Sequence, residues 1–309
     1  MEMIVSDTRM ISDLFQKEVH GSKRKRKRFL FLPPGAKRGV RQAGILHAFA
    51  DHGIPANHFD TIVGTSCGSF NGLAYCAGKA HLVCEEYVRM RFICLKVLVA
   101  RLRALGLEDV SRTDWPRLLV GVSDLSGTLD LENVEEVESA LELCRASSSP
   151  FPLTRGVFIH GKRRIDGAHA DPCPIMRVVR EARRESENMD FFVVACDTHP
   201  RHASVSEWAL FHGLALASLP LFSLSLCTST RLMDAKISRI AEMAAKAHRR
   251  AREYKRIRIC IIFASPKDSI STLEWRESLV RRAGIAGYED ASRLLDAHRR
   301  RALIMTREP

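Results

Sequence analysis

The stretch Gly64-Thr65-Ser66-Cys67-Gly68 decides the fold of this chain. It follows the apolar residues 59–63, which predict a strand, and precedes residues 70–74, which can continue as a helix. A Gly-x-Ser-x-Gly sequence between a strand and a helix predicts a nucleophile elbow, a turn so tight that its flanks must be glycine. We expect the hydroxyl of Ser66 to lie exposed at the tip of this turn, near the positive end of the following helix.

The composition is that of a globular protein with a strong basic bias. The chain has 309 residues, 46% of them hydrophobic, which is enough to bury one large core or two small ones. The formal net charge is +12, with cations concentrated at residues 23–28 and 248–256. Such charge favours an anionic membrane surface or nucleic acid, or it keeps a neighbouring apolar strand soluble. Aromatic residues make up only 7% and do not alternate with the cations, so no nucleic-acid partner is expected.

The sequence predicts neither a membrane span nor a signal peptide. Residues 208–230 are uncharged but contain His212 and Pro220, which favours a buried or surface-lying helical hairpin over a span. No apolar segment precedes the first charges, so we expect a cytoplasmic protein. The nine cysteines form no Cys-x-x-Cys pair, which argues for reduced thiols and against a metal site.

Apolar strands alternate with helices along the chain. Strands are expected at 29–32, 59–63, 118–122, 191–195 and 257–264, with a hairpin over 155–165. Helices are expected at 44–50, 85–105, 134–144, 238–254 and 274–300. This alternation predicts an α/β fold whose mainly parallel sheet is covered on both faces. Residues 85–105 are amphipathic and basic, and fit either a packed surface helix or an element that meets lipid.

An activated serine needs a base and hydrogen-bond donors for the oxygen that becomes negative. The candidate base is Asp166, which ends a short strand and is followed by Gly167. The candidate donors are the backbone N–H groups of the small-residue loop 34–39. Both segments are also compatible with ordinary turns.

Other side chains compete for these roles. A histidine triad could be built on Asp197 with His199 or His202, and His160 and His169 lie close to Asp166 in sequence. Cys67 follows the serine directly, but an elbow exposes only its central residue. We therefore expect Cys67 to pack or to lend its N–H group.

Three blocks of the chain, in order, resemble patatin-like phospholipases. Residues 34–39 are similar to the family's Gly-Gly-Gly-x-(Lys/Arg)-Gly loop, residues 64–68 to its Gly-x-Ser-x-Gly, and residues 166–168 to its Asp-Gly-(Gly/Ala). The segments 146–151 and 171–175 are similar to those that flank the family's aspartate. The resemblance covers about residues 29–295.

The resemblance implies a lipid acyl hydrolase on a three-layer α/β sandwich, with Ser66 as nucleophile and Asp166 as base. It implies no histidine, metal or cofactor in the reaction. The implied oxyanion hole consists of Gly35, Ala36, Lys37, Arg38 and Cys67. The elbow and turn glycines are Gly39, Gly64, Gly68 and Gly167.

The remaining expectations concern organisation and partners. We expect a polar, basic leader at 1–28, a patatin-like hydrolase domain at 29–275 and a helical extension packed on it at 276–309. The substrate would be a lipid, and the cations would hold the protein peripherally at the inner, anionic surface of a membrane. The oligomeric state is left open.

Two departures from the family pattern weaken the implied oxyanion hole. Pro34 and Ala36 stand where the family has glycine. Proline has no N–H group, and alanine fits only if its backbone is not left-handed. A lipid- or anion-binding protein that has lost efficient catalysis is therefore the alternative.

Overall fold

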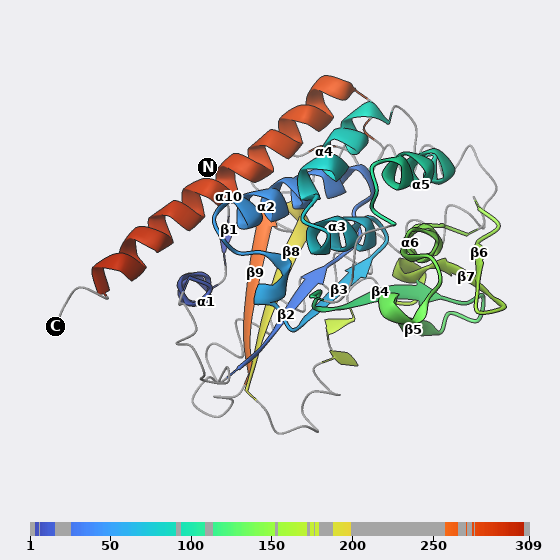
Figure 1. The fold of residues 1–309 in the computed structure, drawn as a ribbon, viewed down its shortest axis with the longest axis horizontal. Helices are drawn as coiled ribbons and strands as arrows, with labels where there is room; N and C mark the ends of the chain where they lie inside the picture. Colours follow the sequence, from blue (N-terminus) through green and yellow to red (C-terminus); the bar gives the residue numbers. More distant parts are fainter. Residues whose placement is uncertain are drawn as a thin grey trace.

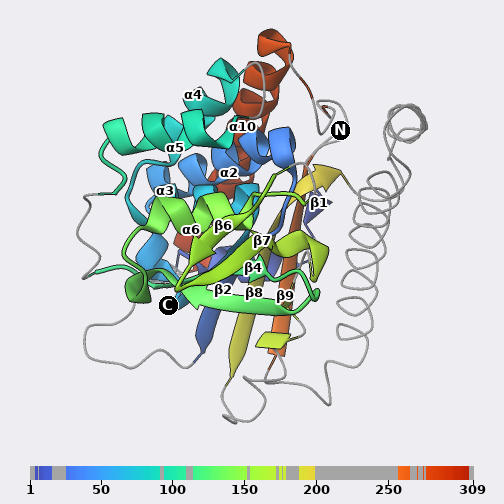
Figure 2. The same cartoon turned by 90° about the vertical axis from the view of Figure 1, so that its right-hand side faces the viewer.

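The structure is a computed structural model, and it describes most of the chain. The described residues are 4–5, 7–15, 26–90, 94–108, 114–151, 154–171, 174–175, 177–178, 188–198, 257–264, 270, 274 and 276–305. They form an α/β fold, in which helices gather on one side of a twisted sheet (Figures 1 and 2). The predicted segments 208–230 and 238–254, and residues His199 and His202, lie outside the described residues.

In the described part of the chain, nine strands form one mixed sheet in the order β1-β9-β8-β2-β3-β4-β7-β6, with β5 paired to β4. The strands are β1 (Ile4–Val5), β2 (Lys27–Leu32), β3 (Thr61–Thr65), β4 (Arg117–Ser123), β5 (Leu129–Asn133), β6 (Val157–Ile159), β7 (Lys162–Asp166), β8 (Met189–Thr198) and β9 (Ile257–Ala264). The five central strands, from β9 to β4, are parallel to their neighbours, and the outer strands pair antiparallel. The predicted α/β class with a mainly parallel sheet is confirmed.

The described helices link these strands. They are α1 (Thr8–Asp13), α2 (Gly39–Asp51), α3 (Cys67–Cys76), α4 (Ala80–Arg89), α5 (Leu95–Ala104), α6 (Ala140–Ser147) and α10 (Glu277–Met305), with short 3-10 turns at Ala36–Arg38, Ala56–His58, Val134–Glu136 and Gly167–His169. The long helix α10 crosses over α2 and α4 in Figure 1, and its glycines allow close contact there. A Cβ atom on Gly287 would lie only 2.4 Å from the carbonyl oxygen of Arg41 in α2.

Side chains along each central strand point alternately to the two faces of the sheet, and both faces are buried. Leu30 and Leu32 of β2 belong to a large core that includes side chains of α2, α3, α4, α6 and α10. Phe29 and Phe31 point to the opposite face and belong to a second cluster, where Phe29 stacks on Phe191 of β8 and Phe31 packs against the same ring at a tilt. This arrangement explains why the central strands read as continuously apolar in sequence.

Helix α1 contributes to the larger core. Met10, Ile11 and Leu14 are fully buried in the same cluster as the side chains of α2 and α10. Asp7 caps the helix by accepting a hydrogen bond from the N–H of Arg9, at 3.0 Å. The N-terminal segment therefore carries apolar side chains that pack, beside the polar character that its composition suggested.

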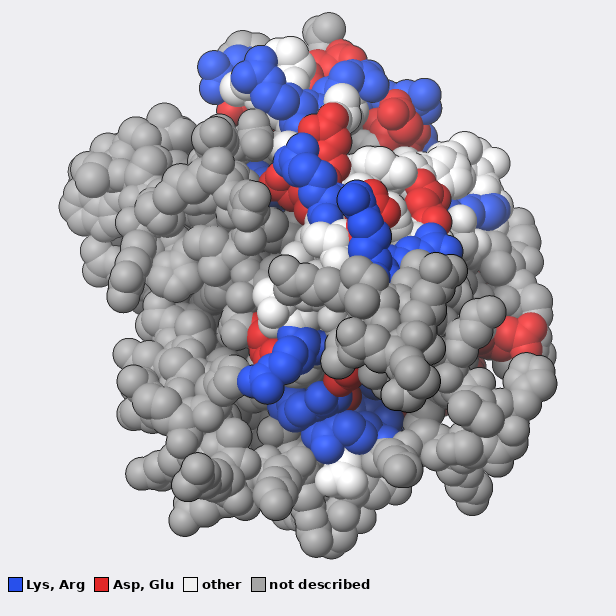
Figure 3. All heavy atoms as spheres, turned by 90° about the vertical axis from the view of Figure 1, so that its left-hand side faces the viewer, with Lys and Arg blue, Asp and Glu red and all other residues white. Residues whose placement is uncertain are grey.

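The end of the basic segment 23–28 is tied to the amino-terminal edge of the sheet. The side chain of Arg26 donates to the buried carboxylate of Asp190, at 2.6 Å, and Arg258 binds the same carboxylate through two nitrogens, at 2.7 and 2.5 Å. Arg258 also contacts Asp13, at 2.7 Å. These cations neutralise a buried charge, so part of the basic bias is structural. On the face seen in Figure 3, other Lys and Arg side chains mix with acidic ones.

Two helix predictions need correction. The single helix expected over 85–105 is two helices, α4 and α5, separated at Met90, whose backbone is extended. The helix expected over 134–144 is a 3-10 turn followed by α6, which begins only after its N-cap Ser139. No helix in the described part of the chain is long and apolar enough to cross a membrane.

Candidate active site

The strand register places the three sequence blocks at one edge of the sheet. Leu32 of β2 pairs with Gly64 of β3, so the loop after β2 and the turn after β3 lie side by side at the carboxyl ends of the strands. On the other side, Val122 of β4 pairs with Asp166 at the end of β7. Ligands bind at this edge in open α/β sheets.

The turn at Ser66 has the strained geometry of an elbow. Ser66 lies between β3 and α3 with φ of 54° and ψ of −125°, a conformation that non-glycine residues rarely adopt. Such a backbone costs about 1–3 kcal/mol and persists only where its surroundings hold it. Ser66 is only 8% exposed, so the expectation that its hydroxyl lies exposed at the tip of the turn is wrong: the serine is buried at the sheet edge.

The two glycines that flank Ser66 are required by close approaches of the backbone. A Cβ atom on Gly68 would lie 1.9 Å from the carbonyl oxygen of Leu32, and one on Gly64 would lie 2.6 Å from the carbonyl oxygen of Gly68. The first contact packs α3 directly against the end of β2. The prediction that these positions need glycine therefore has a steric basis here.

The structure brings Ser66 and Asp166 together across 100 residues of sequence. The Oγ atom of Ser66 donates to Oδ2 of Asp166 at 2.9 Å. The other oxygen, Oδ1, accepts from the backbone N–H of Ala168 at 2.8 Å, which fixes the carboxylate plane. Gly167 allows the turn, because a Cβ atom there would lie 2.3 Å from the carbonyl oxygen of Gly121.

Burial makes Asp166 a stronger base than an ordinary carboxylate. Its side chain lies out of water, and this desolvation raises its pKa from 3.8 to about 7, although the hydrogen bonds from Ala168 and Ser66 act in the opposite direction. A base whose pKa lies near neutral pH is well matched to proton transfer. The pair can thus move a proton from the serine hydroxyl to the carboxylate.

A scaffold of serines, which the sequence did not single out, holds this pair in place. The N–H of Ser66 donates to Oγ of Ser147 at 2.9 Å, and that hydroxyl donates to the carbonyl oxygen of Gly121 at 2.6 Å. The hydroxyl of Ser123 donates to the carbonyl oxygen of Asp166 at 2.7 Å. The N–H of Asp166 donates to the carbonyl oxygen of Ser149 at 2.9 Å. The only sequence signal for them was the similarity of residues 146–151 to the family.

The backbone of the candidate oxyanion loop supplies fewer donors than expected. The N–H of Arg38 donates to the carbonyl oxygen of Gly35 at 2.9 Å, so it closes the turn and does not point outward. Ala36 has φ of 47°, the left-handed conformation that its side chain disfavours. Gly35 itself is packed tightly, because a Cβ atom there would lie 2.4 Å from Cβ of Cys196.

The side chains of Lys37 and Arg38 anchor the loop from below. Nζ of the buried Lys37 donates to the carbonyl oxygens of Tyr87, at 2.7 Å, and Met90, at the carboxyl end of α4. Desolvation lowers the pKa of this amine to about 8. Nε of Arg38 donates to the carbonyl oxygen of Ile270 at 3.1 Å. None of these contacts involves Ser66, so these two side chains have positioning roles.

A buried amide pair links the same loop to α3. Nδ2 of Asn71 donates to the carbonyl oxygen of Gly39 at 2.9 Å and to Oε1 of Gln42 at 2.7 Å. Nε2 of Gln42 in turn donates to the carbonyl oxygen of Val194 at 2.7 Å. Gly39 lies against the elbow, since a Cβ atom there would lie 2.8 Å from Sγ of Cys67. The loop, the elbow helix and β8 are thereby held in one unit.

The other candidate nucleophile, Cys67, and the described candidate histidines do not contact the Ser66 hydroxyl. Cys67 is buried with Sγ 3.9 Å from Sγ of Cys196, inside the packing beneath the loop. His160 is exposed in the β6–β7 turn. Burial lowers the pKa of His169. Within the described residues, the hydroxyl of Ser66 contacts Asp166 and no histidine.

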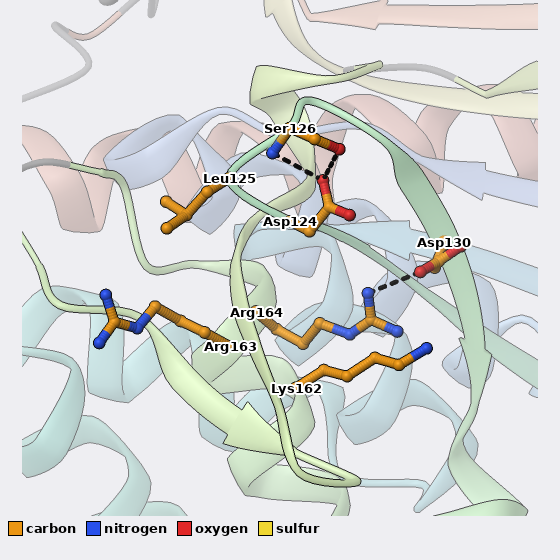
Figure 4. Close-up of a pocket in the computed structure, with 7 residues that line it drawn as sticks. All are labelled: Asp124, Leu125, Ser126, Asp130, Lys162, Arg163 and Arg164. Carbon is orange, nitrogen blue, oxygen red and sulfur yellow. Dashed lines mark hydrogen bonds and ion pairs between the residues drawn. The ribbon is translucent and has the colours of Figure 1, made fainter.

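The surroundings of the site bear on metal binding and on access to the dyad. Among the described residues, no three His, Cys, Asp or Glu side chains cluster in a way that could hold a metal ion. An open hollow of about 450 Å³ lies beyond the ends of β4 and β7, as Figure 4 shows. Its lining residues are Asp124, Leu125, Ser126, Asp130, Lys162, Arg163 and Arg164.

Comparison with known proteins adds little to this geometry. No family model and no curated protein matches the chain. Among solved structures, the chain is similar to one described as the crystal structure of VipD from Legionella pneumophila, with 11% sequence identity and a TM-score of 0.40. The similarity covers 90% of this chain and 68% of that chain. At this level it carries no inference about activity, which therefore depends on the residues of the site.

Proposed function

We propose that this protein is a lipid acyl hydrolase of patatin-like type that uses a dyad of Ser66 and Asp166. The observation that carries the proposal is the 2.9 Å hydrogen bond from the Ser66 hydroxyl to the Asp166 carboxylate, made at a strained turn. The raised pKa of Asp166 gives the same pair a base suited to neutral pH. The three-layer arrangement of the sandwich belongs to this proposal as well.

The proposed reaction has two halves that use the same two side chains. Oγ of Ser66 attacks the ester carbonyl while Asp166 takes its proton, which forms a tetrahedral intermediate. The intermediate collapses to an acyl ester on Ser66, and the proton passes from Asp166 to the departing alcohol oxygen. Water then gives its proton to Asp166 and attacks the acyl ester, releasing a fatty acid and restoring the serine hydroxyl.

The negative oxygen of the intermediate needs donors close to Ser66. The N–H of Ser66 itself is bound to Ser147, and that of Arg38 is bound to Gly35. The proposed donors are therefore the N–H groups of Gly35, Ala36, Lys37 and Cys67, for which the described residues supply no backbone acceptor.

Lipid substrates and an anionic membrane surface complete the proposal. The net charge of +12 favours anionic bilayers, at about 1 kcal/mol for each well-placed cation. The protein would work at the inner membrane surface as a peripheral protein, without a cofactor and without a nucleic-acid partner.

The test joins a covalent probe with product identification. Labelling by a fluorophosphonate at Ser66, and release of fatty acid from a mixed lipid extract measured by mass spectrometry, are expected for the parent protein. Ser66→Ala should abolish both, and Asp166→Asn should slow both about 10²–10⁴-fold, the range for a general base. Ser278→Ala changes an exposed serine on α10 and serves as the matched control.

A second candidate function is a lipid- or anion-binding protein with weakened catalysis. Three features of the loop favour it. Pro34 has no N–H group, the N–H of Arg38 is hydrogen-bonded to the carbonyl oxygen of Gly35, and Ala36 has a left-handed backbone. Loss of one oxyanion donor costs about 10²–10³ in rate. Complete inertness of the parent protein toward the fluorophosphonate, with lipid binding retained, would select this candidate over the hydrolase.

A further inference from the structure

Two turns project beyond the sheet edge at which Ser66 and Asp166 lie. β4 pairs antiparallel with β7, with Val122 opposite Asp166 and Ser123 opposite Ile165. Following β4 outward therefore leads to the turn 124–128, and following β7 in the same direction leads back to Lys162 at its start. Both tips extend past the dyad on the same side of the sheet.

These tips carry exposed apolar side chains that belong to one surface. Leu125 is 54% exposed and Phe158, on β6, is 66% exposed. Leu125 and Arg163 line the same hollow and point to the same side of it in Figure 4. The guanidinium of Arg163 lies 5.6 Å from the ring centroid of Phe158, so Arg163 connects the Phe158 ring with the hollow that Leu125 lines.

The exposed charged side chains at the start of β7 are basic. Lys162 and Arg163 are both exposed there, and Lys162 points to the opposite side of the strand from Arg163 and Leu125 (Figure 4), so the two cations flank the tip on both faces. Arg164, by contrast, is buried and pairs with Asp130 at 2.6 Å and Glu132 at 2.5 Å, so its single charge is shared between these two acids.

The remaining acid of the hollow is engaged inside its own turn. Asp124 accepts hydrogen bonds from the N–H groups of Ser126, at 2.9 Å, and Thr128, at 3.0 Å. We call Leu125, Phe158, Lys162 and Arg163 the tip patch.

We propose that the tip patch docks the protein on a phospholipid bilayer that contains anionic lipid. Leu125 and Phe158 enter the boundary between headgroups and acyl chains, while Lys162 and Arg163 bind lipid phosphates. Apolar side chains flanked by cations are the composition that binds this boundary, and the stacked Arg163 keeps its charge beside the inserted ring. The inference rests on the proposed function, because it brings a lipid surface to the edge that holds Ser66.

Three other cations lie at the opposite edge of the sheet, which supports the choice of the tip patch as the docking surface. Arg26, Arg28 and Arg258 lie at the amino-terminal edge of the parallel strands, at the start of β2 and β9. The six residues of β2 span about 20 Å, at about 3.3 Å per residue. A membrane bound to that edge would face away from Ser66, whereas the tip patch lies on the edge that carries it.

Vesicle co-sedimentation of the Ser66→Ala protein tests the docking without hydrolysis. The vesicles are phosphatidylcholine with and without phosphatidylglycerol. The double variant Leu125→Ser/Phe158→Ser and the double variant Lys162→Gln/Arg163→Gln should each weaken binding about tenfold or more. Only the second should reduce the preference for phosphatidylglycerol.

The matched control lies on another surface of the molecule. Ile285 is 51% exposed on α10 and Arg282 of the same helix is also exposed, so Ile285→Ser/Arg282→Gln removes one apolar side chain and one cation there. This variant should bind vesicles as the parent does. Equal binding by the control and both tip-patch variants would overturn the proposal, as would absence of vesicle binding by the Ser66→Ala protein.

A spectroscopic readout is independent of overall affinity and of folding losses. Phe158→Trp should show quenching by brominated lipid above that of the parent, and Ile285→Trp should not. Self-association through the patch, seen as a sedimentation change on substitution without loss of vesicle binding, would also count against docking. Fluorophosphonate labelling of the parent tests the hydrolase separately, so either proposal can fail while the other stands.

Discussion

The backbone N–H of Ser66 is held by the hydroxyl of Ser147, at 2.9 Å. Ser147 is fully buried, and its hydroxyl donates a hydrogen bond to the carbonyl oxygen of Gly121, at 2.6 Å. A single side chain thus joins the elbow to the neighbouring strand β4. We infer that it holds the strained backbone of Ser66 in place.

Ser147→Ala should therefore damage both stability and chemistry. It leaves the N–H of Ser66 and the carbonyl of Gly121 without this partner, at a cost of about 1–3 kcal/mol in the free energy of unfolding. Urea denaturation measures that loss, and the rate of fluorophosphonate labelling measures the effect on the nucleophile. Ser278→Ala, at an exposed position of α10, should change neither quantity. An unchanged labelling rate in Ser147→Ala would show that the elbow keeps its geometry without this contact.

The pH dependence of labelling should report the ionisation of Asp166. Its carboxylate must be ionised to accept the serine proton, and burial raises its pKa to about 7. The labelling rate should therefore rise with pH, level off above about pH 7, and show a single midpoint there. A midpoint below pH 5 would mean that Asp166 is well solvated in the working protein.

The same raised pKa makes Asp166 a cost to stability at alkaline pH. The folded state favours the protonated form, so the stability from this group is present below pH 3.8 and is lost as pH rises through about 7. Asp166→Asn removes that dependence. Relative to the parent, its free energy of unfolding should gain about 2–3 kcal/mol between pH 5 and pH 8.5.

This comparison uses the pH slope because the variant also loses one acceptor. Asp166 accepts from both Ala168 and Ser66, whereas an asparagine side chain has a single carbonyl oxygen. That loss is independent of pH and shifts both measurements equally. Parallel pH profiles for the parent and Asp166→Asn would contradict the raised pKa.

Ala36→Gly should relieve strain in the candidate oxyanion loop. The left-handed conformation at φ of 47° costs alanine about 1 kcal/mol, which offsets the 0.4–1 kcal/mol that glycine loses through its freer unfolded chain. We expect stability unchanged within about 1 kcal/mol and faster labelling of Ser66. Ala77→Gly, at a right-handed position with φ of −76°, should only lose stability. Equal losses in the two variants would show that Ala36 is unstrained.

Much of the site could be read from sequence because its signals are local. The pattern of Gly64, Ser66 and Gly68 describes one turn, and the structure shows the steric reason for each glycine. The α/β class follows from apolar strands alternating with helices. Asp166 was found through the order of blocks, since an Asp-Gly pair alone marks any turn.

The supporting contacts could not be predicted because they join distant segments. Nothing in a row of three serines says that Ser147 is the one that reaches Ser66, 81 residues away. The break between α4 and α5 also escaped, since the carbonyls of Tyr87 and Met90 are taken by Lys37, which is remote in sequence. The hydrogen bond from the N–H of Arg38 to the carbonyl oxygen of Gly35 could not be predicted from the sequence either.

The paired arginines on Asp190 bear on how the protein is handled in the laboratory. A protein that begins at residue 29 would lack helix α1, whose apolar side chains pack in the larger core. It would also lack Arg26, so that Arg258 would be the remaining described cation on the Asp190 carboxylate. Removing one partner of a buried ion pair commonly costs about 3–5 kcal/mol. Expression from residue 29 should therefore yield insoluble material, although every residue of the proposed dyad would still be encoded.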